Sequence, residues 1–360
     1  MVFDPSKPYN DLPPLPPAAE IDTKAILRKC ISANRALAEL KAGGRLIPNQ
    51  TILINAIPLQ EAQASSEIEN IVTTQDALYR ATLHPEKADA ATKEVLNYRQ
   101  ALKAGWESLR TRPLSTRTFV EVCRGLLDVD IDIRRTPGVT LTNKATGKVI
   151  YTPPETESLI RDLLGNLEKF LHDDAAGLDP LIRLAVAHYQ FEAIHPFGDG
   201  NGRTGRIINI LYLIEKGLLE IPVLYLSGHI IQNKNQYYRL LRAVTEKGAW
   251  EDWILYMLDA VEETARWTAG RIAGIRQLLD ETARLCREKL PTVYSRELVE
   301  LLFVQPYCRI ENLVENGIAK RVTASKYLAS LEKEGIISGI KVWKETLYVN
   351  NGLLELLVRR

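Results

Sequence analysis

The sequence is poor in cysteine and carries almost no excess charge. Its four cysteines are scattered with no C-x-x-C pair: Cys30, Cys123, Cys286 and Cys308. This spacing argues against a disulfide scaffold or a zinc ribbon, and it indicates a reducing compartment in which the four side chains are buried as small apolar groups. The formal net charge is +1, so no field of the whole chain favours nucleic acid or a membrane surface.

Long apolar runs and a targeting signal are also lacking. The chain begins Met-Val-Phe-Asp-Pro-Ser-Lys-Pro, without the basic segment and apolar run of a signal peptide. No apolar run approaches the length that spans a bilayer. We therefore expect a cytoplasmic protein. What is present is ordinary for a globular chain, with 46% hydrophobic and 25% charged residues, and its 360 residues suffice for about two domains.

One stretch concentrates the chemistry of the chain: residues 195–206, His-Pro-Phe-Gly-Asp-Gly-Asn-Gly-Arg-Thr-Gly-Arg. It holds an imidazole, a carboxylate, four glycines and two guanidiniums, and an apolar segment of helical length follows it. A glycine-rich turn that opens a helix binds anions through free amide groups and the helix dipole. Two arginines favour phosphates, which guanidinium binds bidentately. The stretch therefore predicts a reaction on a nucleotide.

Other interpretations of these glycines fit less well. Their G-x-G-x-x-G spacing matches the dinucleotide-binding fingerprint, but that motif follows a buried strand, whereas residues 181–194 have the length of a helix. The Gly-Lys-Ser/Thr of a P-loop is missing. A calcium loop needs acidic or amide side chains at alternate positions, and Arg203 and Arg206 oppose a cation. A plain turn would not explain two arginines together with a His-Pro-Phe segment.

The stretch resembles the signature of the Fic family, His-x-Phe-x-(Asp/Glu)-Gly-Asn-Gly-Arg-x-x-Arg, and every fixed position is met. The resemblance implies a mainly α fold, a Fic helical core with a small β-hairpin flap, and transfer of AMP from ATP to a Ser, Thr or Tyr hydroxyl of a target protein, with release of pyrophosphate. It implies that His195 is the general base, that Asp199 binds Mg²⁺ and that Phe197 is a buried anchor. The residues expected to bind ATP are Gly200, Asn201, Gly202, Arg203, Thr204, Gly205 and Arg206.

Residues 65–70, Ser-Ser-Glu-Ile-Glu-Asn, gain meaning only beside this signature. They look like the family's inhibitory motif, (Ser/Thr)-x-x-x-Glu-(Gly/Asn), which Ser65, Glu69 and Asn70 would meet. Glu69 is counted with the ATP-binding residues as well, because it would then pair with Arg206 and withdraw it from the γ-phosphate of ATP. Breaking one side of a buried pair costs about 3–5 kcal/mol, and about 1.4 kcal/mol is a tenfold change in binding, so one carboxylate suffices for strong inhibition.

Composition divides the N-terminal part of the chain. Six prolines in residues 1–20 predict an extended arm on the domain surface. Residues 21–110 predict a helical region that contains the inhibitory segment, and its first helix is expected to end at Gly43-Gly44.

Residues 111–285 are expected to form the catalytic core. Within it, β-type alternation on both sides of a turn predicts a hairpin over residues 137–152. The resemblance makes this hairpin the flap that receives a target by strand addition, although a plain surface hairpin is the alternative. The residues expected to bind the target are Thr140, Leu141 and Thr142.

Residues 229–246 predict one helix with Tyr237 and Tyr238. The resemblance places Tyr238, and less strongly Tyr237, beside the nucleotide, and two core tyrosines are an equal alternative.

Residues 289–360 resemble a winged helix, with a helix, a turn, a second helix and a β-rich wing. The second helix would present Lys320, Arg321, Ser325 and Lys326. The net charge of this part is only about +3, so packing, homodimerisation or target docking is favoured over DNA binding.

Three functions stay open at this point. The first is AMP transfer restrained by Glu69. The second is removal of AMP from modified proteins by the same site, with Glu69 positioning a water molecule. The third is a DNA-binding regulator whose core senses a nucleotide.

Overall fold

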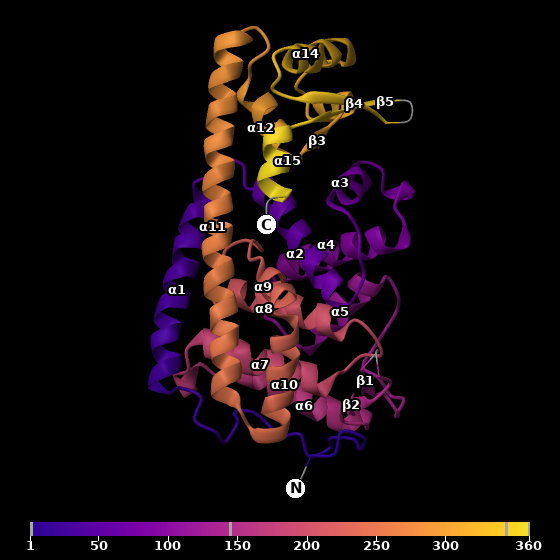
Figure 1. Ribbon diagram of the computed structural model, residues 1–360, viewed down its shortest axis with the longest axis vertical. Helices are drawn as coiled ribbons and strands as arrows, with labels where there is room; N and C mark the ends of the chain where they lie inside the picture. Colours follow the sequence, from indigo (N-terminus) through magenta and orange to yellow (C-terminus); the bar gives the residue numbers. More distant parts are fainter. Residues whose placement is uncertain (1–2, 144–145, 343–344, 359–360) are drawn as a thin grey trace.

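The computed structural model describes residues 3–143, 146–342 and 345–358, and this part of the chain is mainly helical. Figure 1 shows a lower helical body that holds both the N-terminal region and the core, with a smaller C-terminal domain above it. The helix α11 (Trp250–Lys289) runs along both parts, and α1 (Lys24–Arg45) packs beside its lower half. The other long helices of the body are α2 (Thr51–Ile68), α4 (Ala90–Ser108), α5 (Thr116–Leu127), α6 (Glu157–His172), α7 (Pro180–Ile194), α8 (Asn201–Glu215) and α10 (Lys234–Lys247). The short ones are α3 (Gln75–Leu83), α9 (Leu226–Gln232) and the 3₁₀ turns η1 (Pro85–Lys87) and η2 (Asp174–Ala176).

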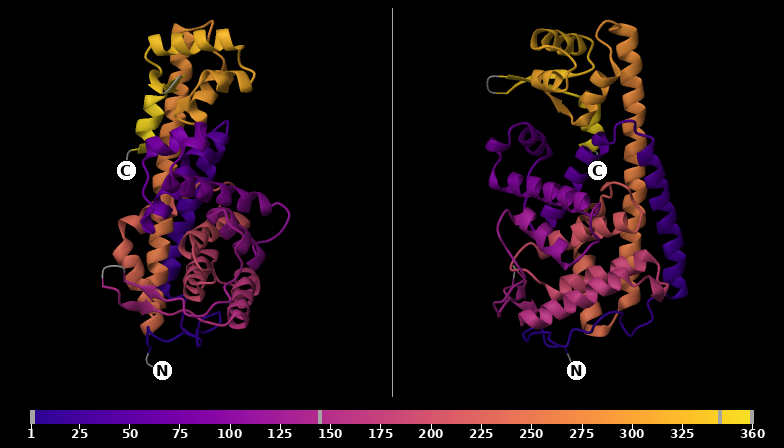
Figure 2. Two further views of the ribbon diagram at one scale, coloured as in Figure 1. Left: turned by 90° about the vertical axis from the view of Figure 1, so that its right-hand side faces the viewer. Right: turned by 180° about the vertical axis from the view of Figure 1, so that it is seen from behind.

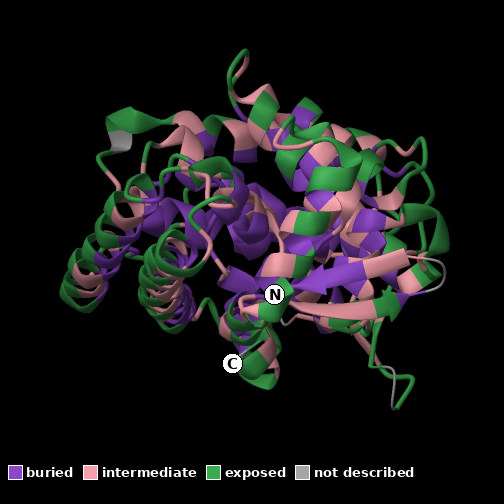
Figure 3. Ribbon diagram, turned by 90° about the horizontal axis from the view of Figure 1, so that it is seen from above, coloured by how far each residue is buried: buried purple, intermediate pink, exposed green. Residues whose placement is uncertain are grey.

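Apolar packing places the candidate site in the middle of this body. Seen from above, buried segments lie inside and exposed ones form the outer surface (Figure 3). Both α7 and α8 are buried along nearly their whole length, as expected for two apolar helices at the centre of a core. The four cysteines are all buried and none forms a disulfide, which confirms their interpretation as small buried side chains.

The first helix does not end where the sequence suggested. Thr23 caps the N-terminus of α1 by accepting a hydrogen bond from the amide of Ile26, but the glycine pair lies inside the helix, which continues to Arg45. Glycine inside a helix costs about 1 kcal/mol relative to alanine. Packing of α1 along α11 offsets this cost. A Cβ added to Gly43 or Gly44 would meet Ile272 of α11 or Leu53 of α2 only at the ordinary contact distances of 4.0 and 3.9 Å.

One further helix prediction differs from the structure. The single helix expected over residues 229–246 is two helices, α9 and α10, because Asn233 leaves the helical region with φ −116° and ψ 31°. The expected inhibitory segment lies at the end of α2. Ser65 is in the last turn of this helix, and Glu69 follows directly after its end.

The hairpin predicted in the core is present but short. Strand β1 (Leu141–Thr142) pairs antiparallel with β2 (Val149–Tyr151). Thr140 lies just before β1 rather than in it. Part of the predicted turn, residues 144–145, lies outside the described residues.

The C-terminal domain has the expected order of a helix, a turn, a helix and a two-stranded wing. It consists of α12 (Arg296–Val304), β3 (Tyr307–Cys308), α13 (Ile310–Glu315), α14 (Arg321–Lys333), β4 (Ser338–Val342), β5 (Glu345–Val349) and α15 (Asn351–Val358). The three strands form a sheet in the order β3-β5-β4, and Gly317 has φ 68° in the turn after α13. The exposed start of α14 carries Lys320, Arg321 and Lys326.

This domain packs on the N-terminal helices (Figure 2). The Tyr307 hydroxyl donates to Asp76 at the start of α3, and the Gln60 amide of α2 donates to the Leu357 carbonyl of α15. The domain is therefore fastened to α2, the helix that ends at the inhibitory motif. Within the described ranges, no helix is long and apolar enough to cross a membrane.

Candidate active site

The signature forms a turn between two buried helices. α7 ends at Ile194, His195 follows in the left-handed region with φ 50°, and α8 begins at Asn201. The left-handed conformation costs about 1–2 kcal/mol for a residue with a side chain, so the surroundings of His195 must hold it there. Gly200 has φ 78°, and a Cβ at this position would approach Leu126 and Leu127 at 3.3 Å, so glycine is required on both counts.

The loop is closed by Asn201 and anchored by Phe197. The Asn201 side chain accepts from the Phe197 amide at 2.9 Å and donates to the Phe197 carbonyl at 2.8 Å. Phe197 is fully buried, which confirms its predicted place as the anchor. The side chain of Asn201 therefore maintains the loop, and any contact with phosphate would come from its main-chain amide.

Arg206 is held entirely by the end of α2. Its Nε donates to Ser65 Oγ at 2.7 Å, and its Nη2 donates to the Ser65 carbonyl and to Glu69 Oε1, both at 2.9 Å. Arg206 is 1% exposed, whereas the Glu69 side chain is 36% exposed. The contact predicted between Glu69 and Arg206 is thus present. Asn70 follows with φ 67°, which turns the chain away from the site.

The Glu69 carboxylate covers the first turn of α8. A Cβ added to Gly202 would lie 2.5 Å from Glu69 Oε1 and 2.9 Å from Arg206 Nη1. The carboxylate and the guanidinium therefore lie directly on this glycine. An anion bound at the N-terminus of α8 would have to take the place of the carboxylate.

Arg203 has a partner that sequence reasoning missed. Its Nη1 donates to Glu94 of α4 at 2.8 Å, and Nη2 lies 3.8 Å from Asp199. Asp199 itself is 77% exposed, and its Oδ1 accepts from the Gly200 amide at 2.6 Å. Nothing in the local pattern of Glu94 marked it, because only the folded chain brings α4 to α8.

The imidazole of His195 is held in its neutral form. Burial, followed by the charge of Arg134, lowers its pKa to about 4, against smaller opposing effects of Glu69 and Asp199. Arg134 Nε donates to the His195 carbonyl at 2.7 Å, so this arginine also helps to hold the left-handed residue. Sequence reasoning missed Arg134 as well, since it lies in the irregular segment before the hairpin.

A second carboxyl group, also unexpected, lies behind the loop. Glu192 is in the last turn of α7, and a Cβ at Gly205 would approach its Oε1 at 2.8 Å, so glycine allows this close contact. Burial raises the pKa of Glu192 to about 7, although Arg206 acts in the opposite direction. The neighbouring Thr204 is fully buried, like Arg203 and Arg206.

The tyrosine pair divides into one core and one surface residue. Tyr237 is buried and its hydroxyl bonds His188 Nε2 at 2.8 Å, whereas Tyr238 is 42% exposed and packs edge-on against Tyr237. Burial and Arg206 lower the pKa of His188 to about 3.

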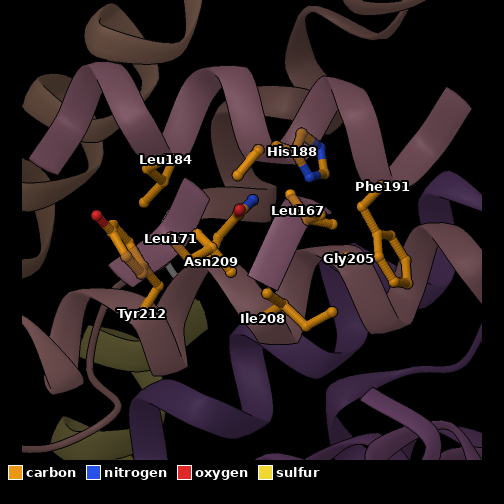
Figure 4. Close-up of a pocket in the computed structure, with 10 residues that line it drawn as sticks. Leu167, Leu171, Leu184, His188, Phe191, Gly205, Ile208, Asn209 and Tyr212 are labelled. Atoms are coloured by element: carbon orange, nitrogen blue, oxygen red, sulfur yellow. The ribbon is translucent and has the colours of Figure 1, made fainter. Parts of the chain in front are cut away.

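The interior gap beside His188 is too small for a ligand. It lies between α6, α7 and α8 and has a volume of about 10 Å³ (Figure 4). His188, Phe191 and Gly205 lie around it. This gap holds at most a water molecule, so His188 is structural.

The fold and the loop define a helical protein whose candidate site lies between two central helices, with a base at the end of one and two arginines on the next. Residues 115–213 match the family model described as Fic/DOC family, residues 27–107 match the Fic/DOC family N-terminal model, and residues 278–353 match the C-terminal domain of protein adenylyltransferase SoFic-like. The chain belongs to the Fic family.

Curated relatives are similar over part of their length. Protein adenylyltransferase Fic of Drosophila yakuba is 28% identical over 154 residues, which are 42% of this chain and 30% of the relative. Probable protein adenylyltransferase aq_aa38 of Aquifex aeolicus is 26% identical over 192 residues, 52% of this chain and 55% of the relative. The chain thus matches about half or less of the length of these relatives.

Solved structures share the fold. A Fic family protein from Desulfovibrio desulfuricans superposes with a TM-score of 0.58 at 19% identity, covering 91% of this chain and 96% of that one. Fic-1 (residues 134–508) from C. elegans gives a TM-score of 0.51 at 20% identity over 70% of this chain and 74% of that one.

Proposed function

We propose that the protein is an ATP-dependent protein adenylyltransferase that transfers AMP to a Ser, Thr or Tyr hydroxyl of a target protein, and that Glu69 restrains it. The observation that carries the proposal is the Glu69 carboxylate lying on Gly202 while it pairs with Arg206. A carboxylate in this place occupies the anion site of the α8 N-terminus and uses a guanidinium suited to phosphate. The curated relatives, named protein adenylyltransferases, support the same reaction.

The residues of the loop suit this group transfer. His195 is neutral above pH of about 4 and can take the proton from the attacking hydroxyl. The hydroxyl oxygen forms a bond to the α-phosphorus of ATP, and the bond from that phosphorus to the pyrophosphate oxygen breaks. Arg206 would hold the outer phosphates after Glu69 leaves, and the main-chain amides of Gly200, Asn201 and Gly202 would face the phosphate oxygens.

Asp199 fits a Mg²⁺ ion that arrives together with the nucleotide. The Asp199 side chain is 77% exposed, and its Oδ2 lies 3.8 Å from Arg203 Nη2, which is too long for a hydrogen bond. In the described part of the chain, no group of three or more His, Cys, Asp or Glu side chains could hold a metal by itself. Mg²⁺ commonly binds through one carboxylate and substrate phosphates, and here it would stabilise the negative charge of the leaving pyrophosphate.

The test is the Glu69→Gly variant incubated with ATP labelled at the α-phosphate. Labelling of the protein itself and of lysate proteins should rise at least tenfold over wild type, since Arg206 is released. Glu67→Gly is the matched control, because Glu67 lies two residues earlier, in the last turn of α2, and lines a cavity with Tyr225 and Trp267. His195→Ala should abolish the labelling. Equal labelling by wild type and Glu69→Gly would reject the inhibitory role.

Removal of AMP by the same site is the second candidate, and the state of Glu69 favours it. Burial acts to raise the pKa of Glu69, but Arg206 outweighs it and the pKa is lowered, so the carboxylate is ionised at neutral pH. An ionised carboxylate on the phosphate-binding turn can orient a water molecule toward a phosphorus atom.

The flap is the proposed site for the target. Thr140 and Thr142 are exposed and Leu141 is half-buried, so the short β1 strand offers main-chain groups for strand addition. Tyr238 is proposed to contact the nucleotide because it is the exposed member of the tyrosine pair.

A further inference from the structure

Arg134 joins the catalytic loop to the flap. It lies in the segment between α5 and β1, and its side chain is 7% exposed. The guanidinium donates to three main-chain carbonyls, those of His195 at 2.7 Å, Ile194 at 3.3 Å and Pro154. His195 begins the catalytic loop, Ile194 is the last residue of α7, and Pro154 lies three residues after β2.

The main chain of Arg134 makes a further contact with the same loop. Its amide donates to the Pro196 carbonyl at 2.9 Å. One residue therefore bonds three successive positions, 194 to 196, around the left-handed His195. A lysine could not replace it, because only the planar fork of a guanidinium reaches several acceptors at once.

A second connection runs parallel to the first. The Tyr151 hydroxyl of β2 donates to the Ala193 carbonyl at 2.7 Å. The flap is therefore attached to the end of α7 at two points.

The N-terminal arm covers the other side of the flap base. The Tyr9 amide donates to the Thr152 carbonyl at 2.9 Å, and the Thr152 hydroxyl donates to the Pro5 carbonyl at 2.8 Å. The arm thus occupies main-chain groups that directly follow β2. The outer edge of β1 is the edge left for a target segment.

From these contacts we infer that Arg134 is a positioning residue that fixes the flap relative to His195. A target segment bound along β1 then presents its hydroxyl at the imidazole. The inference rests on the proposed function, and it adds a residue outside both family motifs. Among the described residues, the Arg134 guanidinium donates only to the main-chain carbonyls of residues 154, 194 and 195, so it governs transfer to protein and not the binding of ATP.

The charge of Arg134 affects the pH–rate profile, which a purely structural residue would leave unchanged. Arg134 lowers the pKa of His195, whereas a hydrogen bond with the main chain of Glu192 and the charges of Glu69 and Asp199 raise it. Removing the positive charge should therefore raise this pKa, and the acidic limb of the pH–rate profile should move to higher pH. A lysine keeps the charge and should leave the limb in place.

The experiment compares Arg134→Gln, Arg134→Lys and Arg135→Gln, each in the Glu69→Gly chain. Arg135 is the matched control, since it is exposed and pairs only with Glu157 at 3.1 Å among the contacts described. Label from α-labelled ATP into the protein itself and into lysate proteins measures transfer, and calorimetry with ATP measures nucleotide binding. Arg134→Gln should lose on the order of 100-fold in transfer with unchanged ATP affinity, because a misplacement of about 1 Å has that effect.

Hydrogen exchange keeps the inference testable apart from activity. Amides of residues 149–152 and those of Ile194, His195 and Phe197 should exchange faster together in Arg134→Gln and stay protected in Arg135→Gln. Equal transfer by the two variants, a parallel loss of ATP affinity, or unchanged exchange would each overturn the inference. A Glu69→Gly chain that labels no protein would reject the proposed function instead, and the exchange result would still decide the role of Arg134.

Discussion

Glu69 and Arg206 lie 137 positions apart in the sequence and meet in an ion pair of 2.9 Å above Gly202. The pair is asymmetric, because the arginine is fully buried and the carboxylate is about one third exposed. A buried guanidinium that loses its carboxylate must find another anion, and the phosphates of a nucleotide are the anions that this turn suits. Ser65 would remain in place and keep Arg206 oriented toward the turn.

Ser65 and Ser66 should differ in their effect on stability. Both are fully buried, but only Ser65 bonds Arg206, while the Ser66 hydroxyl has no hydrogen-bond partner within the described ranges. Ser65→Ala should destabilise the fold by about 1–3 kcal/mol, because the buried Arg206 Nε is left unsatisfied, whereas Ser66→Ala should change it by less than about 0.5 kcal/mol. Urea unfolding of both variants measures this difference. Equal losses in the free energy of unfolding would show that Ser65 does not stabilise the fold through its hydrogen bond with Arg206.

The rate of AMP transfer should fall only at an unusually low pH. Only neutral His195 accepts a proton, and the neutral fraction falls as the pH drops through its pKa of about 4. In the Glu69→Gly chain the kcat/KM for protein labelling should therefore be nearly constant from pH 8 to about 5 and decline below that. A limb near the ordinary histidine value of about 6.5 would show that the imidazole is not desolvated as described.

Sequence patterns predicted those parts of the site whose residues are adjacent in the chain. The turn at residues 195–206, the hairpin and the helix-turn-helix followed by a wing are local patterns, and each is present. The contact of Glu69 with Arg206 was also predicted, though only by resemblance to the inhibitory motif. No periodicity or charge pattern would have paired the two residues.

What the sequence did not predict depends on tertiary packing. Glu94 reaches Arg203 because α4 packs against α8, and Arg134 reaches the loop from an irregular segment that carries no pattern. The Gly43-Gly44 pair has the chemistry of a helix end, but α1, which packs along α11, continues through it to Arg45. In each case a distant neighbour overrides or supplements the local preference.

Gly202→Ala should be coupled energetically to Glu69. The added Cβ would meet Glu69 Oε1 at 2.5 Å and Arg206 Nη1 at 2.9 Å, so one of the two groups must move. In wild type we expect a loss of about 1–3 kcal/mol from this overpacking, and a smaller loss in the Glu69→Gly chain, where half of the conflict is removed. A double-mutant cycle by thermal unfolding gives the coupling energy. A coupling energy of zero would place the carboxylate elsewhere in solution.

The seam between α1 and α11 should weaken in acid. Burial acts to raise the pKa of Glu262, but hydrogen bonds from Lys29, Ser32 and Arg266 outweigh it and lower the pKa to about 2. Because the folded pKa lies below the ordinary value of 4.5, the stabilisation is complete above pH 4.5 and is lost as the pH falls toward about 2.

Glu262→Gln should flatten this part of the stability curve, since the variant has no carboxyl group to titrate. Glu281→Gln, on the same helix and exposed, serves as the control. Thermal melting between pH 2 and 6 measures both. If Glu262→Gln lost as much stability in acid as wild type does, other carboxylates would be responsible for the loss.

The direction of the reaction should depend on Glu69 alone. If the carboxylate only blocks the phosphate site, then Glu69→Gly adds AMP faster and wild type does not remove it. If the carboxylate also orients water, then wild type removes AMP from a protein that Glu69→Gly has labelled, and Glu69→Gly itself does not. Glu69→Gln separates the two effects, because an amide is nearly isosteric but cannot act as a base and pairs less strongly with Arg206.

Release of label from the purified modified protein, followed in parallel for wild type and both variants, measures removal. Release by Glu69→Gln at the wild-type rate would exclude Glu69 as the group that activates water, since only the carboxylate can take its proton.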